Sequence, residues 1–218
     1  RFREVRKDIP KALAPIRGIP FIELLLGDLI LQGYRRIILA TGHLSTQLES
    51  YVKSRTDAEY IISNESKPLG TGGAIKFAEN HLHSEQVLIL NGDSHIIFEL
   101  KELFNFHKIC QADVSILLSS VTKGADYGNV VLKEGNRIQS FSEKTNNFGK
   151  SLINAGVYLI NRSILRSLKP QRHYSLEKDC LPLWIKSHRI FGLITDKPFY
   201  DIGTPKRYLN SQNILLKK

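Results

Sequence analysis

Short apolar runs alternate with segments of helical period along the first 120 residues, and this alternation constrains the fold most strongly. The apolar runs fit strands at 36–40, 59–62, 87–90 and 113–118, and the periodic segments fit helices at 20–32, 45–53, 70–78 and 99–108. Alternation at such short intervals is typical of βαβ units with right-handed crossovers. The sequence therefore predicts an α/β fold.

The strand Val87–Leu90 runs directly into Asn91-Gly92-Asp93-Ser94. Four consecutive apolar residues favour a fully buried strand of a parallel sheet. Ligands of open α/β sheets bind just outside the carboxyl ends of the strands. Asp93 is thus placed to be a metal ligand or an acid–base group. The alternative, that Asp93 caps a following helix, stays open on this stretch alone.

A glycine-rich turn precedes the helix expected at 70–78, in Pro68-Leu69-Gly70-Thr71-Gly72-Gly73. Glycines at a helix start let a ligand approach the backbone and leave N–H groups unpaired. The turn matches neither the phosphate-binding P-loop nor the dinucleotide fingerprint. By itself it is a weak signal.

The pattern changes after residue 120. Residues 127–132 and 137–142 predict a hairpin, and the long strand 152–160 is interrupted by Gly156, which indicates close approach of a ligand or of another backbone. Segments 164–168 and 175–184 favour helices, and 190–194 favours a strand. A last strand, 199–202, contains Asp201 and precedes a helix that begins near Pro205.

The formal net charge of +10 raises the question of nucleic-acid binding. The basic residues are scattered, without interleaved aromatics, so we expect no nucleic-acid partner; a basic surface also suits substrates that carry several phosphates. No apolar run has the length of a membrane span, and no signal peptide is evident, so we expect a cytoplasmic protein without a membrane partner. Cys110 and Cys180 are too few for a disulfide framework.

Six short stretches, taken together and in order, resemble the sugar-phosphate nucleotidyltransferase family. They are Pro10-Lys11-Ala12-Leu13, Glu65-Ser66-Lys67-Pro68-Leu69-Gly70-Thr71, Asn91-Gly92-Asp93, Phe141-Ser142-Glu143-Lys144, Asn154-Ala155-Gly156 and Asp201-Ile202-Gly203-Thr204-Pro205. The resemblance implies a Rossmann-like three-layer sandwich with a mainly parallel mixed sheet and an inserted sugar-binding hairpin region. It implies one domain over 1–218, with a nucleotide-binding half at about 1–120 and a sugar-binding half at about 121–218.

The resemblance also implies the chemistry: a sugar 1-phosphate oxygen attacks the α-phosphorus of a nucleoside triphosphate and pyrophosphate leaves. By the family pattern, Asp93 and Asp201 would bind one Mg²⁺, and hard carboxylate oxygens suit that ion. For Asp201 alone, a helix cap is an equal alternative. Arg1, Lys11 and Lys144 would be catalytic, with Lys11 at the α-phosphate and Lys144 at the sugar phosphate.

The remaining site residues follow from the same resemblance. Gly70 and Thr71 would join Asp93 in binding the nucleotide. Glu143 and Asn154 would bind sugar hydroxyls, and Gly128 and Gly156 would leave room for the sugar ring. Three of the site residues have simpler interpretations: Glu143 and Lys144 as an exposed charge pair, and Lys11 as a surface lysine.

Glu65 would select the base. The family position five residues before the glycine of Leu-Gly-Thr meets the base edge. Guanine presents two adjacent donors, N1–H and the N2 amino group, and one carboxylate can accept both. Glu65 therefore favours GTP over UTP or dTTP.

Among the family's branches the chain most resembles the D-glycero-D-manno-heptose 1-phosphate guanylyltransferases, through Lys7-Asp8-Ile9-Pro10-Lys11 and Pro68–Ile75. Mannose 1-phosphate is the alternative sugar, and a non-catalytic nucleotide-binding protein is the alternative class. Family members begin with a strand and a Gly-Gly-x-Gly-Thr-Arg loop around the phosphates. Arg1 matches the last residue of that loop, so we expect the strand and the rest of the loop to be missing from this chain. A homo-oligomer is compatible with the sequence.

Overall fold

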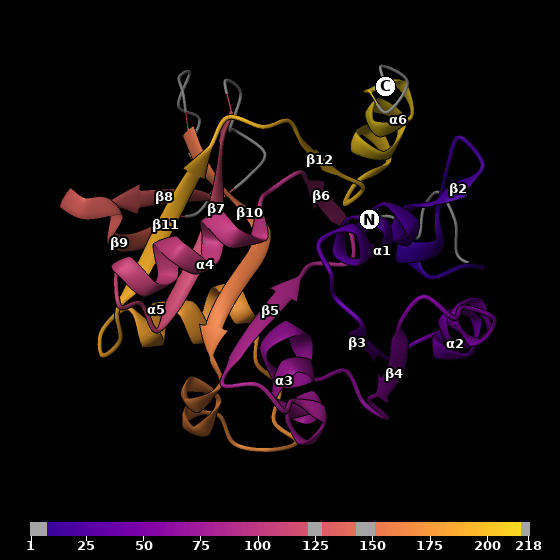
Figure 1. The fold of residues 1–218 in the computed structure, drawn as a ribbon, viewed down its shortest axis with the longest axis horizontal. Helices are drawn as coiled ribbons and strands as arrows, with labels where there is room; N and C mark the ends of the chain where they lie inside the picture. Colours follow the sequence, from indigo (N-terminus) through magenta and orange to yellow (C-terminus); the bar gives the residue numbers. More distant parts are fainter. Residues whose placement is uncertain (1–7, 122–127, 143–150, 215–218) are drawn as a thin grey trace. The chain divides into compact units, whose positions relative to one another are not determined.

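The computed structural model describes residues 8–121, 128–142 and 151–214 (Figure 1). Arg1, Glu143 and Lys144 lie outside the described residues. The chain forms two compact units: unit 1 is Arg1–Pro68, Asn91–Ile97 and Phe199–Lys218, and unit 2 is Leu69–Leu90 and Phe98–Pro198. These units do not follow a single division near residue 120, because the chain passes between them four times. The assignment of nucleotide and sugar binding to two halves stays a prediction.

The described residues of unit 1 form three small sheets. Its elements, with η for short 3-10 or π turns, are η2 (Lys11–Leu13), β1 (Pro15–Ile16), β2 (Ile19–Pro20), α1 (Phe21–Leu31), β3 (Arg36–Thr41), α2 (Ser45–Lys53), β4 (Glu59–Asn64), β6 (Ser94–Ile96), β12 (Phe199–Asp201) and α6 (Pro205–Ile214). The pair β3–β4 is parallel and is connected through α2, as the alternation predicts. The pairs β1–β2 and β6–β12 are antiparallel. Strand β6 was not predicted from the sequence, because its three residues are too few to show a hydrophobic period.

Helices α1 and α2, which precede β4, begin after different kinds of N-cap residue. Helix α1 follows Pro20 and buries Phe21, Ile22 and three leucines along one stripe, as its period predicts. Helix α2 has the predicted bounds, but its N-cap is not one of the polar residue types that usually cap helices. Leu44 is its N-cap residue, with φ of 64°, and Ser45 is already helical.

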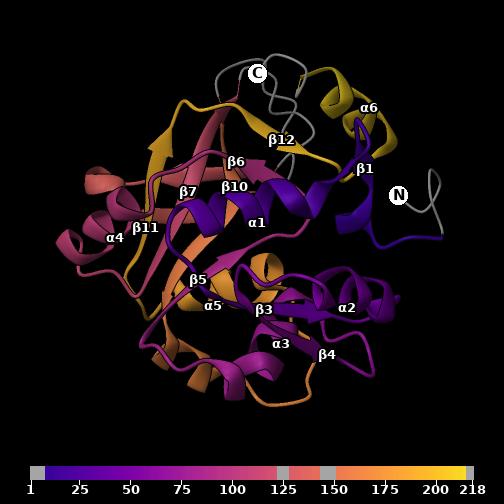
Figure 2. The same ribbon diagram turned by 45° about the vertical axis from the view of Figure 1, so that its right-hand side comes forward.

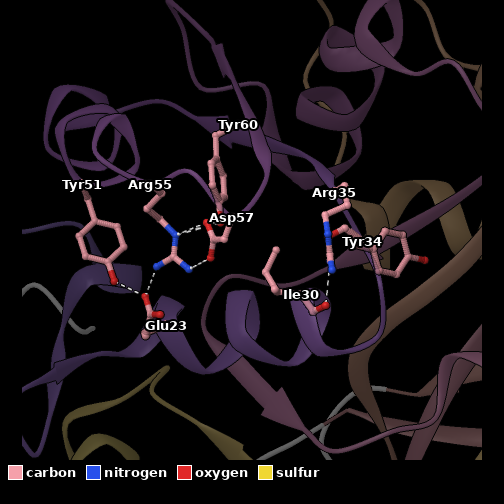
Figure 3. A network of polar contacts seen from close by, with 8 residues as sticks. All are labelled: Glu23, Ile30, Tyr34, Arg35, Tyr51, Arg55, Asp57 and Tyr60. Atoms are coloured by element: carbon pink, nitrogen blue, oxygen red, sulfur yellow. Dashed lines mark hydrogen bonds and ion pairs between the residues drawn. The ribbon is translucent and has the colours of Figure 1, made fainter.

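A polar network joins α1, α2 and β4 within unit 1 (Figure 3). The Arg55 guanidinium donates to Glu23 at 2.5 Å and to Asp57 at 2.5 Å, and its Nε donates to the Tyr60 hydroxyl at 2.9 Å. The Tyr51 hydroxyl also donates to Glu23. Burial and then this bond to Glu23 raise the pKa of Tyr51 to about 12. The network ties α2 to its neighbours at the end of the β3–β4 pair where β4 begins.

Unit 2 is built on one mixed sheet in the order β11-β7-β10-β8-β9, with β5 also paired to β10. Its elements are α3 (Gly70–Phe77), η3 (Ala78–His81), β5 (Gln86–Leu90), α4 (Leu100–Ile109), β7 (Val114–Val121), β8 (Asn129–Leu132), η5 (Glu134–Asn136), β9 (Ile138–Ser142), β10 (Ser151–Asn161), η6 (Arg162–Ser167), η7 (Leu176–Cys180), α5 (Leu181–Trp184) and β11 (Ile190–Thr195). The pair β7–β11 is parallel, and β10 runs antiparallel to β5, β7 and β8. The mixed α/β class is thereby confirmed, as is the β8–β9 hairpin.

Helices cover both faces of this sheet. Alternate residues of β7, Val114, Ile116 and Leu118, pack in one cluster with Tyr158 of β10 and with the η6, η7 and α5 segments. The other face meets α4, where buried His107 bonds to the Ser115 hydroxyl at 2.9 Å. Figures 1 and 2 both show β7, β10 and β11 side by side with α4 against them.

Strand β5 differs from its prediction as a fully buried strand of a parallel sheet. Its five residues are all half-buried, and its ladder with β10 is antiparallel. The apolar run alone cannot tell which partner a strand will take, because an interior strand of either sheet type can be apolar. Among the described helices, none combines the length and the apolar character required to cross a membrane.

Candidate active site

Lys11 and Asp93 meet in unit 1 although 82 residues separate them. The Lys11 Nζ donates to the Asp93 Oδ2 at 2.8 Å, and both side chains are about one-third exposed. An ion pair this exposed contributes about 1 kcal/mol or less to stability. Lys11 is therefore more than an isolated surface lysine, and the pair remains accessible to a ligand.

Asp201 lies beside Asp93 across the β6–β12 pair. Asp201 is registered opposite Ser94, and the Ile202 N–H donates to the Asp93 carbonyl at 3.0 Å. The Asp201 carboxylate is buried; its Oδ1 accepts from the Gly203 N–H at 2.8 Å and from the Arg207 Nη1 at 3.2 Å. The fold thus places the backbones of Asp93 and Asp201 side by side, and Arg207 contacts the Asp201 carboxylate. A shared role for the two carboxylates stays a prediction.

Neither aspartate caps a helix. Strand β6, not a helix, follows Asp93. At the start of α6 the capping contact comes from Thr204, whose Oγ1 accepts from the Arg207 N–H at 3.3 Å. The helix-cap alternative is therefore wrong for both residues.

The residues present fit a hard divalent cation. Among the described residues no group of three or more His, Cys, Asp or Glu side chains gathers to hold a metal. The carboxylates of Asp93 and Asp201 are oxygen donors of the kind that suit a hard divalent ion with further ligands from water and phosphate oxygens. Lys11 and Arg207 balance the two negative charges in this structure.

Glu65 directly follows β4, at the carboxyl end of the parallel β3–β4 pair. Its N–H donates to the Thr41 carbonyl at 2.8 Å, which continues the ladder beyond β4. Glu65 thus stands at a strand end, and base reading by its carboxylate stays a prediction.

The glycine-rich turn serves a different purpose from the one its sequence suggests. The N–H groups of Gly72 and Gly73 donate to the Tyr174 carbonyl at 2.9 and 3.2 Å, so they are not left for a ligand. Gly70 has φ of +69°, and a Cβ there would lie 2.5 Å from the same oxygen. The Thr71 Oγ1 accepts from the Leu176 N–H at 2.9 Å. These contacts give both Gly70 and Thr71 structural roles, and nucleotide binding by them stays a prediction.

Asn154 and Gly156 belong to unit 2, at an irregularity of β10. The register against β7 shifts between Asn154 and Tyr158, Gly156 has φ of 76°, and its N–H donates to the Asn154 Oδ1 at 3.0 Å. The Asn154 Nδ2 donates to the Tyr158 hydroxyl at 2.6 Å and to the Glu177 Oε1 at 3.0 Å. Gly128 is exposed just before β8.

Sequence reasoning missed residues that touch predicted site residues, among them Arg207 and Glu177. Arg207 lies six positions after Asp201, and the predicted start of a helix at Pro205 could have placed it near that carboxylate. Glu177 is exposed at the start of a short helical segment, and no local pattern marks it.

The whole chain, residues 1–218, matches the family model described as nucleotidyl transferase. It is 34% identical over 216 residues to the D-glycero-alpha-D-manno-heptose 1-phosphate guanylyltransferase of Aneurinibacillus thermoaerophilus, which covers 99% of this chain and 93% of that protein. It is 30% identical over 221 residues to the mannose-1-phosphate guanylyltransferase catalytic subunit beta of Drosophila pseudoobscura pseudoobscura, covering 99% of this chain and 59% of that protein. Among solved structures, HddC from Yersinia pseudotuberculosis matches with a TM-score of 0.87 at 28% identity, over 99% of this chain and 94% of that one. HddC has also been solved complexed with GMP-PN.

Proposed function

Because this chain belongs to the nucleotidyl transferase family, we propose that it joins D-glycero-D-manno-heptose 1-phosphate to GTP, giving a GDP-sugar and pyrophosphate for surface polysaccharide synthesis. The observation that carries the proposal is the meeting of Lys11, Asp93 and Asp201 in one unit. One ammonium and two carboxylates suit a reaction in which several phosphates approach one another.

In the proposed reaction a sugar-phosphate oxygen forms a bond to the α-phosphorus, and the bond from that phosphorus to the pyrophosphate oxygen breaks. Lys11 would move from Asp93 to the α-phosphate oxygens and stabilise the negative charge that grows there. Asp93 and Asp201 would hold Mg²⁺, which when bound neutralises phosphate charge. The Gly203 N–H and Arg207 would keep the Asp201 carboxylate oriented.

Different residues would recognise the base and the sugar. A carboxylate at Glu65 can accept from both guanine N1–H and the guanine N2 amino group. Asn154 and Glu177 offer an amide and a carboxylate in one hydrogen-bonded group, which suits sugar hydroxyls. Mannose 1-phosphate is the second candidate, favoured by the likeness to a mannose-1-phosphate guanylyltransferase.

The test is pyrophosphate release by the full-length gene product. The panel crosses GTP, UTP, dTTP, CTP and ATP with heptose, mannose and glucose 1-phosphates in Mg²⁺. We expect activity with GTP and the heptose phosphate. Asp201→Asn should lower kcat by about 100-fold or more, whereas exposed Asp196→Asn should leave it unchanged. Activity with mannose 1-phosphate would favour the second candidate, and GTP binding without turnover would favour a non-catalytic protein.

A further inference from the structure

Gly42 and Glu65 occupy matching positions at the end of the parallel β3–β4 pair. Thr41, the last residue of β3, is registered with Asn64, the last residue of β4. The bond from the Glu65 N–H to the Thr41 carbonyl carries the pairing one step further. The next residues on the two strands, Gly42 and Glu65, are therefore direct neighbours.

Side-chain space, not backbone conformation, is what requires glycine at position 42. Gly42 is not among the glycines with positive φ, so its backbone suits any L-residue. A Cβ atom at this position would lie 3.2 Å from the Glu65 Oε1 and 3.3 Å from its Cγ, tighter than ordinary contact. The atoms that a larger residue would displace belong to the Glu65 side chain.

The same face of β4 has a buried polar group beneath Glu65. Ser63 precedes Glu65 by two residues, so both side chains leave the strand on the same side. Ser63 is 3% exposed, and its hydroxyl has no hydrogen-bond partner within the part of the chain that the structure describes.

We propose that Gly42 is a specificity-determining residue: its bare backbone lets the Glu65 carboxylate take the position from which it distinguishes guanine from a purine that lacks the 2-amino group. The inference rests on the proposed function, in which Glu65 reads the base. Two parallel hydrogen bonds from one carboxylate depend on its placement. Displacement of that carboxylate by a few tenths of an ångström therefore weakens the contact with the 2-amino group.

The experiment compares GTP with ITP, which lacks the 2-amino group, by calorimetric dissociation constants and by kcat/KM with the full-length protein. The wild type should prefer GTP by roughly 10- to 100-fold, the effect of one hydrogen bond to a charged group. Gly42→Ala should reduce the preference to about threefold or less, chiefly by weakening GTP binding. Gly27→Ala is the matched control, since a Cβ at Gly27 meets nothing within 4 Å; it should keep the full preference.

Two further variants separate the possible failures. If Glu65→Gln leaves the GTP-to-ITP ratio unchanged, Glu65 does not read the base and the proposed specificity fails. If Glu65→Gln lowers the ratio and folded Gly42→Ala does not, only the role of Gly42 is overturned. An unfolded Gly42→Ala protein would also overturn it, because the crowding would then extend beyond one side chain.

Glu65→Asp retracts the carboxylate without adding an atom, so it should lower the GTP-to-ITP ratio as Gly42→Ala does. An unchanged ratio would show that the exact position of the carboxylate does not determine the preference.

Discussion

At the scale of single residues, the group formed by Asn154, Tyr158 and Glu177 shows what the fold adds to the sequence. The family resemblance predicts Asn154 as a sugar ligand, whereas Glu177 contacts it from 23 residues away in the chain. Tyr158 is 1% exposed, and its hydroxyl lies 3.4 Å from the Glu177 Oε1. Glu177 is thus the exposed member of a group whose other end is fixed in the sheet.

Replacing Glu177 should therefore affect the sugar more than the nucleotide. We expect Glu177→Gln to raise KM for the sugar 1-phosphate by about tenfold, as for the loss of one hydrogen bond to a charged group. Steady-state kinetics and a GTP dissociation constant measure the two effects separately. Glu134→Gln, an exposed carboxylate in the β8–β9 turn, is the control. A raised dissociation constant for GTP with an unchanged sugar KM would place Glu177 elsewhere in the reaction.

At the scale of elements, Gly70 and Gly135 allow backbone strain to be separated from crowding. Both have φ of +69°, but a Cβ at Gly135 meets nothing within 4 Å, whereas one at Gly70 meets backbone atoms of Tyr174. Gly135→Ala should lower the free energy of unfolding by about 1 kcal/mol, the cost of the left-handed conformation alone. Gly70→Ala should lower it by roughly 2 kcal/mol more, because backbone atoms cannot yield easily. Urea-induced unfolding measures both, and equal losses would show that the α3 start has room to relax.

His107 should make the stability of unit 2 depend on pH. Burial between α4 and the sheet lowers the pKa of His107 from its usual 6.5. The unfolded chain therefore takes up the proton first as pH falls, so the contribution of neutral His107 is complete above about pH 6.5 and is lost as pH drops towards the lower, folded-state pKa. The difference in the free energy of unfolding between about pH 7.5 and about pH 5.5 should be smaller in His107→Gln than in the wild type.

Exposed His83→Gln serves as the control for this pH dependence. It should retain the wild-type difference between the two pH values. A His107→Gln protein with that same difference would mean that another group is responsible.

At the scale of the whole molecule, local patterns predicted the elements well and the pairings poorly. The bounds of α2 and the β8–β9 hairpin follow from period and turn residues, which are local properties. The antiparallel partner of β5 is β10, which lies more than 60 residues away in the chain. Nothing in the apolar run of β5 itself indicates that pairing. The same holds for the site: Lys11, Asp93 and Asp201 were paired only through a family resemblance, and Arg207 and Glu177 were found only once the chain was folded.

The whole molecule should also be stabilised by its nucleotide, and the net charge of +10 determines how this must be tested. GTP at about 100 times its dissociation constant adds about 2.7 kcal/mol, which corresponds to a rise in Tm of about 5–10 °C for a chain of this size. A basic protein gains some stability from any polyanion, so inorganic tripolyphosphate is the matched control, because it carries the charges without a base. We expect GTP with Mg²⁺ to raise Tm well above tripolyphosphate, and UTP to give the same rise as tripolyphosphate. An equal rise with all three would show that charge alone is recognised, and would contradict base reading by Glu65.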